Sequence, residues 1–272
     1  MRYTSHIELN KKALRKNINF LQKKIGKKTK FASVIKGNAY GHGLRKFLPM
    51  AEECGLNYFA VSDSFEAELA LEVKKPETDL MIMNMIDNED LEWAIENDIS
   101  YYIFDYDRLE HTIDAAKKAG KKARIHLELE TGMNRTGFEF NELIRLSDII
   151  KTNSDHLFIE GVCTHYAGAE SIANYVRVND QIKKFNEMSY VLKELGINPK
   201  YYHTACSAAV LTYPETAMDM VRIGIAQYGF WPSKETKMYN LLNSEFKYKT
   251  DPLQRVISWK SRVMTVKEVA PG

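Results

Sequence analysis

The chain alternates between two patterns of apolar and polar residues over most of its length. The first pattern is a short run of apolar, β-branched or aromatic residues, which predicts a buried strand. The second has the spacing of helices and lies between the runs. Eight runs predict strands at Phe31–Ile35, Tyr58–Val61, Leu80–Met83, Tyr101–Phe104, Arg124–Leu129, Leu157–Thr164, Tyr201–Thr204 and Met220–Ile223.

The segments between the runs repeat apolar residues every three or four positions, as amphipathic helices do. After the second strand, Asp63 and Glu66 have capping-box spacing. Phe65, Leu69 and Val73 would form the apolar side of the helix that follows. Helices are predicted over residues 11–24, after Asp63, and over 91–97, 107–119, about 141–150 and a long segment that ends near 195–196.

Strands that alternate with helices predict a parallel sheet, and eight strands are the number that closes a (β/α)8 barrel. A chain of 272 residues is long enough for this fold. The predicted fold class is therefore α/β, a TIM barrel over residues 1–245.

The alternation stops after the eighth strand. Residues 234–250 are polar and irregular, and the segment after Pro252 is β-prone, with Ile257, Trp259 and Val263 among polar residues. Because one or two strands cannot bury a core alone, we expect residues 246–272 to begin an all-β domain of which the chain holds only a part. The alternative is a terminal strand that docks back on the barrel.

Composition excludes several classes of partner. The net charge is +2, and the two signs are interspersed, which gives no basis for binding nucleic acid or a membrane surface. The three cysteines, Cys54, Cys163 and Cys206, are far apart and lack the spacing of metal ligands. Sparse cysteines and the lack of an apolar signal region predict a cytoplasmic protein without a metal.

The segment Val34–Gly43, V-I-K-G-N-A-Y-G-H-G, is the most informative part of the chain. Lys36 follows an apolar strand, where partial burial lowers the pKa of its amine and makes it a usable nucleophile or base. The glycines that follow allow backbone to approach a bound group closely. We interpret Lys36 as a Schiff-base lysine beside a small, phosphorylated cofactor.

Other unusual residues follow the predicted strands at the same end of the barrel, where barrel active sites are built. They are Arg135 after strand five, His165 after strand six, Ser207 after strand seven, and Arg222, Gly224 and Ile225 at strand eight. A phosphate there would meet the Ser207 hydroxyl and the backbone N–H groups of Gly224 and Ile225.

These motifs resemble those of the alanine racemase family. The matching segments are K-G-N-A-Y-G-H-G, E-T-G-M-N-R-T-G-F, C-T-H-Y-A, H-T-A-C-S-A-A and V-R-I-G-I-A-Q-Y-G, all in family order, and H-I-E-L-N is similar to the opening strand. The resemblance implies a fold-type III racemase that depends on pyridoxal 5'-phosphate (PLP). This chain would be its N-terminal barrel and the start of its C-terminal β domain.

The resemblance also implies the roles of individual residues. Lys36 would carry PLP as a Schiff base and exchange it for the substrate amine. Arg222 would face the pyridine nitrogen, and Arg135 the phenolic oxygen. The implied catalytic residues are Lys36, His165 and Arg135, and the implied cofactor-binding residues are Lys36, Tyr40, Arg135, His165, Ser207, Arg222, Gly224 and Ile225.

Interconverting L- and D-alanine needs proton transfer on both faces of the α-carbon. By resemblance, Lys36 serves one face, and a tyrosine from the β domain of a partner subunit serves the other. We therefore expect a homodimer for the full-length protein, weaker association for this chain, and little racemisation by this chain alone. The family's product, D-alanine, supplies peptidoglycan.

Two positions depart from the family pattern. Glu128 stands where many members have a lysine that is carbamylated, and its carboxylate would orient Arg135 without modification. The alternative is an ordinary surface glutamate. Cys206 stands where an asparagine is frequent, and we assign it no role.

Three other functions fit part of these observations. A racemase of a larger amino acid would use the same barrel. A non-catalytic, single-barrel PLP-binding protein would lack the second domain. A Schiff-base aldolase would use Lys36 without PLP, and only the PLP-binding classes would show a visible absorbance from a PLP–lysine bond.

Overall fold

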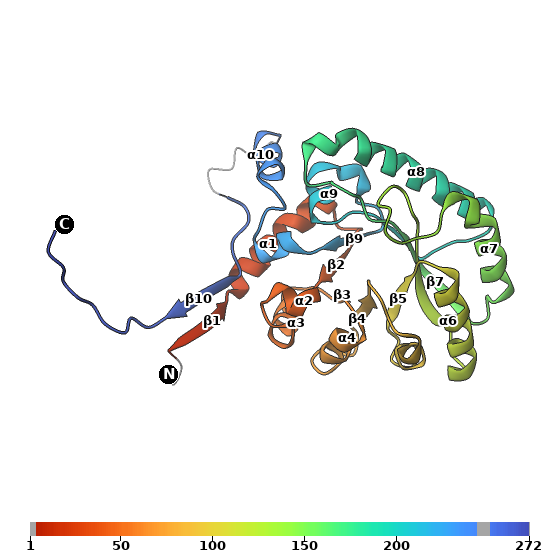
Figure 1. Cartoon of the computed structure of the whole chain (residues 1–272), viewed down its shortest axis with the longest axis horizontal. Helices are drawn as coiled ribbons and strands as arrows, with labels where there is room; N and C mark the ends of the chain where they lie inside the picture. Colours follow the sequence, from red (N-terminus) through yellow and green to blue (C-terminus); the bar gives the residue numbers. More distant parts are fainter. Residues whose placement is uncertain (1–3, 244–250, 272) are drawn as a thin grey trace.

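The computed structural model describes residues 4–243 and 251–271. Eight parallel strands form a nearly closed barrel near the centre of the molecule (Figure 1). They pair in the order β8-β7-β6-β5-β4-β3-β2-β9. The fold confirms the predicted α/β barrel, with strands at β2 (Lys30–Val34), β3 (Tyr58–Val61), β4 (Asp79–Ile82), β5 (Ser100–Ile103), β6 (Ala123–Glu128), β7 (Leu157–Cys163), β8 (Tyr201–His203) and β9 (Met220–Ile223).

Two backbone hydrogen bonds join the ends of this series. Arg222 donates its N–H to the Ala205 carbonyl at 2.9 Å, and Asp219 donates to the Tyr202 carbonyl at 3.1 Å. The bonds bring the segment after β8 beside β9. Side chains that follow β8 and side chains on β9 therefore reach the same end of the barrel.

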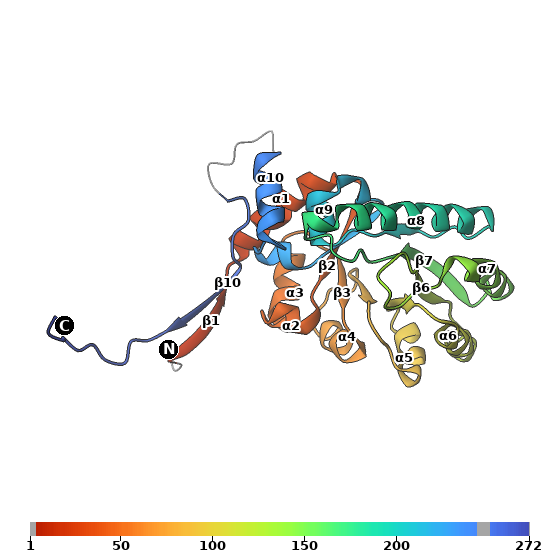
Figure 2. The same ribbon diagram turned by 45° about the horizontal axis from the view of Figure 1, so that its top comes forward.

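Helices cover the outside of the barrel (Figure 2). Their boundaries follow local chemistry: Asn10 and Asp105 cap two N-termini with their side chains, and Gly120 ends a helix at a φ of 63°. The helices are α1 (Lys11–Ile25), α2 (Lys36–Tyr40), α3 (Leu44–Glu52), α4 (Ser64–Leu71), α5 (Leu91–Glu96), α6 (Tyr106–Ala119), α7 (Leu143–Thr152), α8 (Tyr175–Glu194), α9 (Ser207–Thr212) and α10 (Lys234–Leu242).

The apolar core has two parts. The larger part lies between the strands and the surrounding helices, where burial of alternate strand residues drives packing. The smaller part fills the inside of the barrel with Ala32, Val34, Tyr58, Ala60, Met81, Tyr102, Cys163 and Met220. Polar side chains share this interior, among them His126 and His203, which are fully buried.

The apolar side predicted for α4 is wrong at Phe65, whereas Leu69 and Val73 are partly buried against the core. Phe65 is 67% exposed, whereas Glu66 is buried. Asp63 does cap the helix, since its carboxylate accepts the Glu66 N–H at 3.0 Å. The Glu66 side chain does not close a capping box, because it accepts backbone N–H groups from Ser62 and Asn38 instead. Tertiary contacts therefore decide which face of α4 is buried.

The segment that we predicted to be irregular begins with a helix. Helix α10 is capped by Ser233, whose hydroxyl accepts the Thr236 N–H at 3.0 Å. The buried face of α10 is polar, and Asn240 donates to the Leu211 carbonyl at 2.8 Å. A helix that buries polar residues lacks the apolar period by which sequence analysis finds helices. Residues 244–250 lie outside the described part.

Two further strands form a separate antiparallel sheet. Strand β1 (Ser5–Leu9) pairs with β10 (Ile257–Ser261), and the pair extends away from the barrel (Figure 1). The chain before β10 packs against the barrel, where Val256 is buried. Trp259 in β10 is 79% exposed. The predicted boundary between residues 245 and 246 lies outside the described residues, and the division into domains stays a prediction.

In the part of the chain that the structure describes, no helix combines the length and apolar character needed to cross a membrane.

Candidate active site

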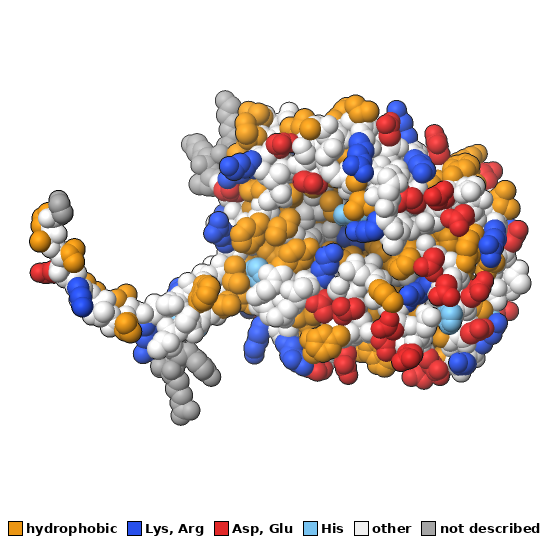
Figure 3. Space-filling model, in the orientation of Figure 1, with side chains coloured by type: hydrophobic (Ala, Val, Ile, Leu, Met, Phe, Trp, Pro, Cys, Tyr) orange, Lys and Arg blue, Asp and Glu red, His pale blue; other side chains and the backbone are white. Residues whose placement is uncertain are grey.

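A cavity of about 320 Å³ opens at the end of the barrel where the strands terminate. In the space-filling view, basic side chains gather in a hollow near the middle of this face (Figure 3). The structure brings together all eight residues that we predicted for the site. Lys36, Tyr40, Arg135, His165, Ser207, Arg222, Gly224 and Ile225 all line the cavity.

Lys36 begins an unusual turn directly after β2. Residues 37–41 all have positive φ, between 53° and 80°. L-residues adopt this left-handed conformation at a cost, so the segment needs support from its surroundings. Glu66 supplies it, since its carboxylate accepts the Asn38 N–H at 2.7 Å. The Asn38 side chain accepts the Leu44 N–H at 2.8 Å, which fixes the far end of the turn.

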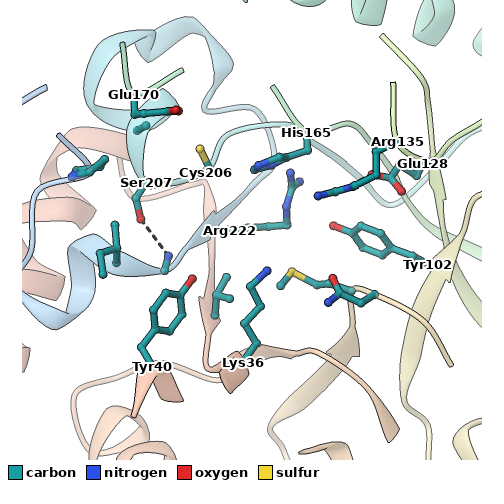
Figure 4. Close-up of a pocket in the computed structure, with 17 residues that line it drawn as sticks. Lys36, Tyr40, Tyr102, Glu128, Arg135, His165, Glu170, Cys206, Ser207 and Arg222 are labelled. Atoms are coloured by element: carbon teal, nitrogen blue, oxygen red, sulfur yellow. Dashed lines mark hydrogen bonds and ion pairs between the residues drawn. The ribbon is translucent and has the colours of Figure 1, made fainter. Parts of the chain in front are cut away.

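The Lys36 amine points into the cavity (Figure 4). Partial burial lowers its pKa, and the nearby cations Arg135 and Arg222 lower it further. Glu66 acts in the opposite direction. A lysine with a lowered pKa holds more neutral amine near pH 7, and the neutral form is the one that attacks a carbonyl or accepts a proton.

Tyr40 and Ser207 lie on one side of Lys36 (Figure 4), and Gly224 joins them in a polar corner. The Ser207 hydroxyl accepts the Gly224 N–H at 3.0 Å. A Cβ atom at Gly224 would lie 2.3 Å from the Tyr40 hydroxyl, so a side chain there would displace that hydroxyl. A backbone N–H and two hydroxyls therefore converge where a side chain would otherwise stand, and such a corner suits an anionic oxygen.

Arg222 lies at the centre of the site, almost fully buried. Its guanidinium donates to three backbone carbonyls, those of His203, Thr164 and Thr204, at 2.8, 2.7 and 3.1 Å. It also contacts Nδ1 of His203 at 2.6 Å. Because arginine only donates, this nitrogen must accept, and the neutral His203 ring carries its proton on Nε2.

That proton points toward a second buried histidine. Nε2 of His203 lies 2.9 Å from Nδ1 of His126. The two rings meet over Gly161 on β7, where a Cβ would lie 2.2 Å from the His126 ring. With its Nδ1 accepting, His126 carries its own proton on Nε2 and donates toward the opposite end of the barrel.

The chain of hydrogen bonds ends on an ion pair. Nε2 of His126 is 3.2 Å from the Tyr58 hydroxyl, which in turn donates to Glu160 at 3.4 Å. Glu160 is fully buried, and Arg124 binds both its oxygens at 2.7 and 2.8 Å. The donors all point one way, from Arg222 to Glu160, so each histidine is held as one neutral tautomer.

These neutral histidines should make the protein less stable in acid. Burial, followed by nearby cations, lowers the pKa of His165 to about 3 and the pKa values of His126 and His203 well below the ordinary value. Below an unfolded pKa of about 6.5, the unfolded chain therefore binds protons that the folded protein does not. Lowering the pH from 7 to 5.5 should cost about 1 kcal/mol for each histidine, roughly 3 kcal/mol together.

Urea unfolding at the two pH values measures this loss. His111 is exposed, so the variant His111→Gln should lose as much stability between pH 7 and pH 5.5 as the wild type does. An unfolding midpoint that does not change with pH would show that the folded protein can protonate these rings.

Arg135 reaches the cavity from the loop after β6. Glu130 organises this loop by accepting three backbone N–H groups, from Gly132, Asn134 and Arg135. Glu128 is buried, so the interpretation as a surface glutamate is wrong. Its carboxylate accepts the Thr136 hydroxyl at 2.8 Å and lies 3.9 Å from the Arg135 guanidinium, a charge contact longer than a hydrogen bond.

Residues 9–232 match the family described as "Alanine racemase, N-terminal domain". The chain belongs to the alanine racemase family. It is 33% identical over 267 residues to an alanine racemase of Listeria monocytogenes, covering 98% of this chain and 67% of that protein. An alanine racemase of Desulforamulus reducens is 32% identical over 270 residues, covering 97% and 68%. This chain thus spans about two thirds of the length of these alanine racemases.

The solved alanine racemases have the same fold. The alanine racemase of Clostridium difficile 630 superposes with a TM-score of 0.87 at 27% identity, covering 100% of this chain and 68% of that one. The comparison confirms the resemblance that the motifs indicated and the barrel that the strand pattern predicted. The roles of the individual site residues remain predictions.

Sequence analysis missed several residues that line the cavity of this alanine racemase family member. The wall of the cavity also includes Tyr102 on β5, Met83 and Asn84 after β4, and Glu170 after β7. Strand alternation could have placed Tyr102, since it follows outward-facing Tyr101. Glu170 lies in a loop without a periodic pattern, and only the fold brings it to the site.

Proposed function

We propose that this protein is a PLP-dependent amino-acid racemase that interconverts L- and D-alanine. One observation carries the proposal: a lysine amine with a lowered pKa lies between a polar corner suited to phosphate and a buried arginine, all in one cavity. The close relatives named alanine racemase support alanine as the substrate.

The residues of the cavity fit PLP. The corner formed by Tyr40, Ser207 and Gly224 would hold the phosphate, with the Ile225 backbone beside it. Arg222 would donate to the pyridine nitrogen, and Arg135 would face the phenolic oxygen. When bound, PLP would supply an electron sink that makes the α-hydrogen of the amino acid acidic.

The chain's own residues would then move and hold the proton. Lys36 accepts the α-hydrogen at Nζ on one face of the amino acid and can return it. Arg222 cannot give up a proton, so the pyridine nitrogen would remain an acceptor and the sink would stay moderate. His165 stays neutral because its pKa is lowered to about 3, so it adds no positive charge beside the ring.

The wider roles are proposals that rest on the family. A homodimer would bring a tyrosine from the partner subunit to the second face of the α-carbon. The D-alanine produced would supply peptidoglycan synthesis, and the protein would act in the cytoplasm. A small amino acid is then its substrate, with no role for nucleic acid or a membrane.

The test follows the α-hydrogen directly. The protein with PLP is incubated with L-alanine and, separately, D-alanine in D2O, and loss of the α-proton signal is followed by ¹H NMR. A single base suffices for exchange of one enantiomer, so the test does not depend on the partner's tyrosine. PLP binding without exchange of any amino acid would favour a PLP-binding protein. Exchange of larger amino acids in preference to alanine would change the substrate.

Glu128→Gln should weaken the hold on Arg135. The substitution keeps the shape and the contact to Thr136 but removes the charge that faces the guanidinium at 3.9 Å. Since Arg135 is about half exposed, screening limits the effect, and we expect exchange to slow roughly 3- to 10-fold. Wild-type exchange should not respond to added bicarbonate, because a glutamate needs no CO2. An unchanged rate in the Gln variant would show that the charge of Glu128 does not orient Arg135.

A further inference from the structure

Strand β5 carries two tyrosines, and of these Tyr102 faces the inside of the barrel and lines the cavity. Its hydroxyl points into the cavity from the side that also carries Arg135 and Glu128 (Figure 4). The Tyr102 ring packs against the two buried histidines, with its centroid 5.9 Å from that of the His126 ring and 6.2 Å from that of the His203 ring. These contacts fix the direction of the hydroxyl.

The Tyr102 hydroxyl is buried, and no nitrogen or oxygen atom of the described residues lies at hydrogen-bonding distance and angle from it. Its polar neighbour is the Cys163 thiol, whose sulfur is a weak acceptor. A buried hydroxyl with so weak a partner is poorly satisfied, whereas phenylalanine would fill the same space without that cost. An acceptor supplied by a ligand would satisfy the hydroxyl.

The position of Tyr102 limits which ligand atom it can meet. The phosphate corner around Ser207 lies on the other side of Lys36 and Arg222 (Figure 4). A ligand whose anionic group lies in this corner would extend between Lys36 and Arg222. The edge of the ligand farthest from the corner would then face Tyr102 and Arg135. Burial raises the pKa of Tyr102 well above its ordinary value, so the hydroxyl keeps its proton and donates.

We propose that Tyr102 is a cofactor-binding residue that donates a hydrogen bond to the phenolic oxygen of PLP, together with Arg135. The inference rests on the proposed function, because it takes PLP as the ligand of this cavity. It adds a donor that the sequence motifs did not indicate. Two donors on one oxygen would hold the ring edge in place while Lys36 acts.

A comparison of two ligands with two variants tests this assignment. The ligands are pyridoxamine 5'-phosphate and its analogue without the phenolic hydroxyl. Neither can form a Schiff base with Lys36, so calorimetry on the 272-residue protein measures non-covalent binding alone. The variant is Tyr102→Phe. Tyr101→Phe is the matched control, because Tyr101 is also buried on the same strand, its hydroxyl lies beside the Thr112 hydroxyl, and it faces the outer core instead of the cavity.

We expect Tyr102→Phe to weaken binding of pyridoxamine phosphate about 10-fold and binding of the analogue less than 2-fold. Tyr101→Phe should leave both affinities unchanged, and Tyr102→Phe should unfold close to the wild-type temperature. Equal losses for the two ligands, or no loss, would overturn the role of Tyr102 alone. Failure of the wild type to bind pyridoxamine phosphate would overturn the proposed cofactor as well.

Discussion

Replacing Lys36 with alanine should abolish covalent attachment of PLP and slow exchange of the alanine α-hydrogen by about 10⁴-fold, the upper end for loss of a positioned base. The effect is large because one amine performs both tasks. Among the described residues that line the cavity, Lys36 is the only lysine. Its position is fixed by the left-handed turn that Glu66 supports, so a neighbouring lysine cannot take its place.

Borohydride reduction followed by peptide mapping checks the assignment. The pyridoxyl group should be found on Lys36 in the wild type and on no residue in Lys36→Ala. Lys24→Ala is the matched control, because burial also lowers the pKa of Lys24, which lies on α1 outside the cavity. A label on another lysine, or exchange that persists in Lys36→Ala, would contradict the role of Lys36.

The strands were predictable because their pattern is local. A buried parallel strand needs a run of apolar residues, and all eight runs became barrel strands with shifts of a few residues at their ends. The number of strands, eight, then predicted that the sheet closes into a barrel. The site followed from the same map, because residues after parallel strands meet at one end, as Lys36, Ser207 and Arg222 do.

The features that were missed depend on contacts between distant parts of the chain. Glu66 is buried where its carboxylate accepts the Asn38 N–H of the turn after Lys36, and no periodic pattern encodes that contact. Helix α10 buries Thr236 and Asn240 instead of an apolar stripe. The pairing of His126 with His203 requires the barrel to bring β6 and β8 to either side of Gly161.

Arg222→Ala should slow α-hydrogen exchange by about 10³-fold, the size of effect seen when one preorganised donor is removed from a reaction centre. The substitution removes the donor proposed for the pyridine nitrogen. It also leaves three carbonyls and Nδ1 of His203 without the partner that the guanidinium provides. Unpaired buried acceptors should lower the free energy of unfolding by about 3 kcal/mol or more.

A partly buried arginine outside the cavity, Arg124, separates these two effects. Arg124→Met leaves the carboxylate of Glu160 buried without its main partner, which should destabilise the protein by about 3 to 5 kcal/mol. Arg124 does not line the cavity, so exchange should remain within a few-fold of the wild type at a temperature where both variants are folded. Equal loss of exchange in the two variants would mean that Arg222 acts only through stability. A loss confined to Arg222→Ala places its guanidinium at the reacting group.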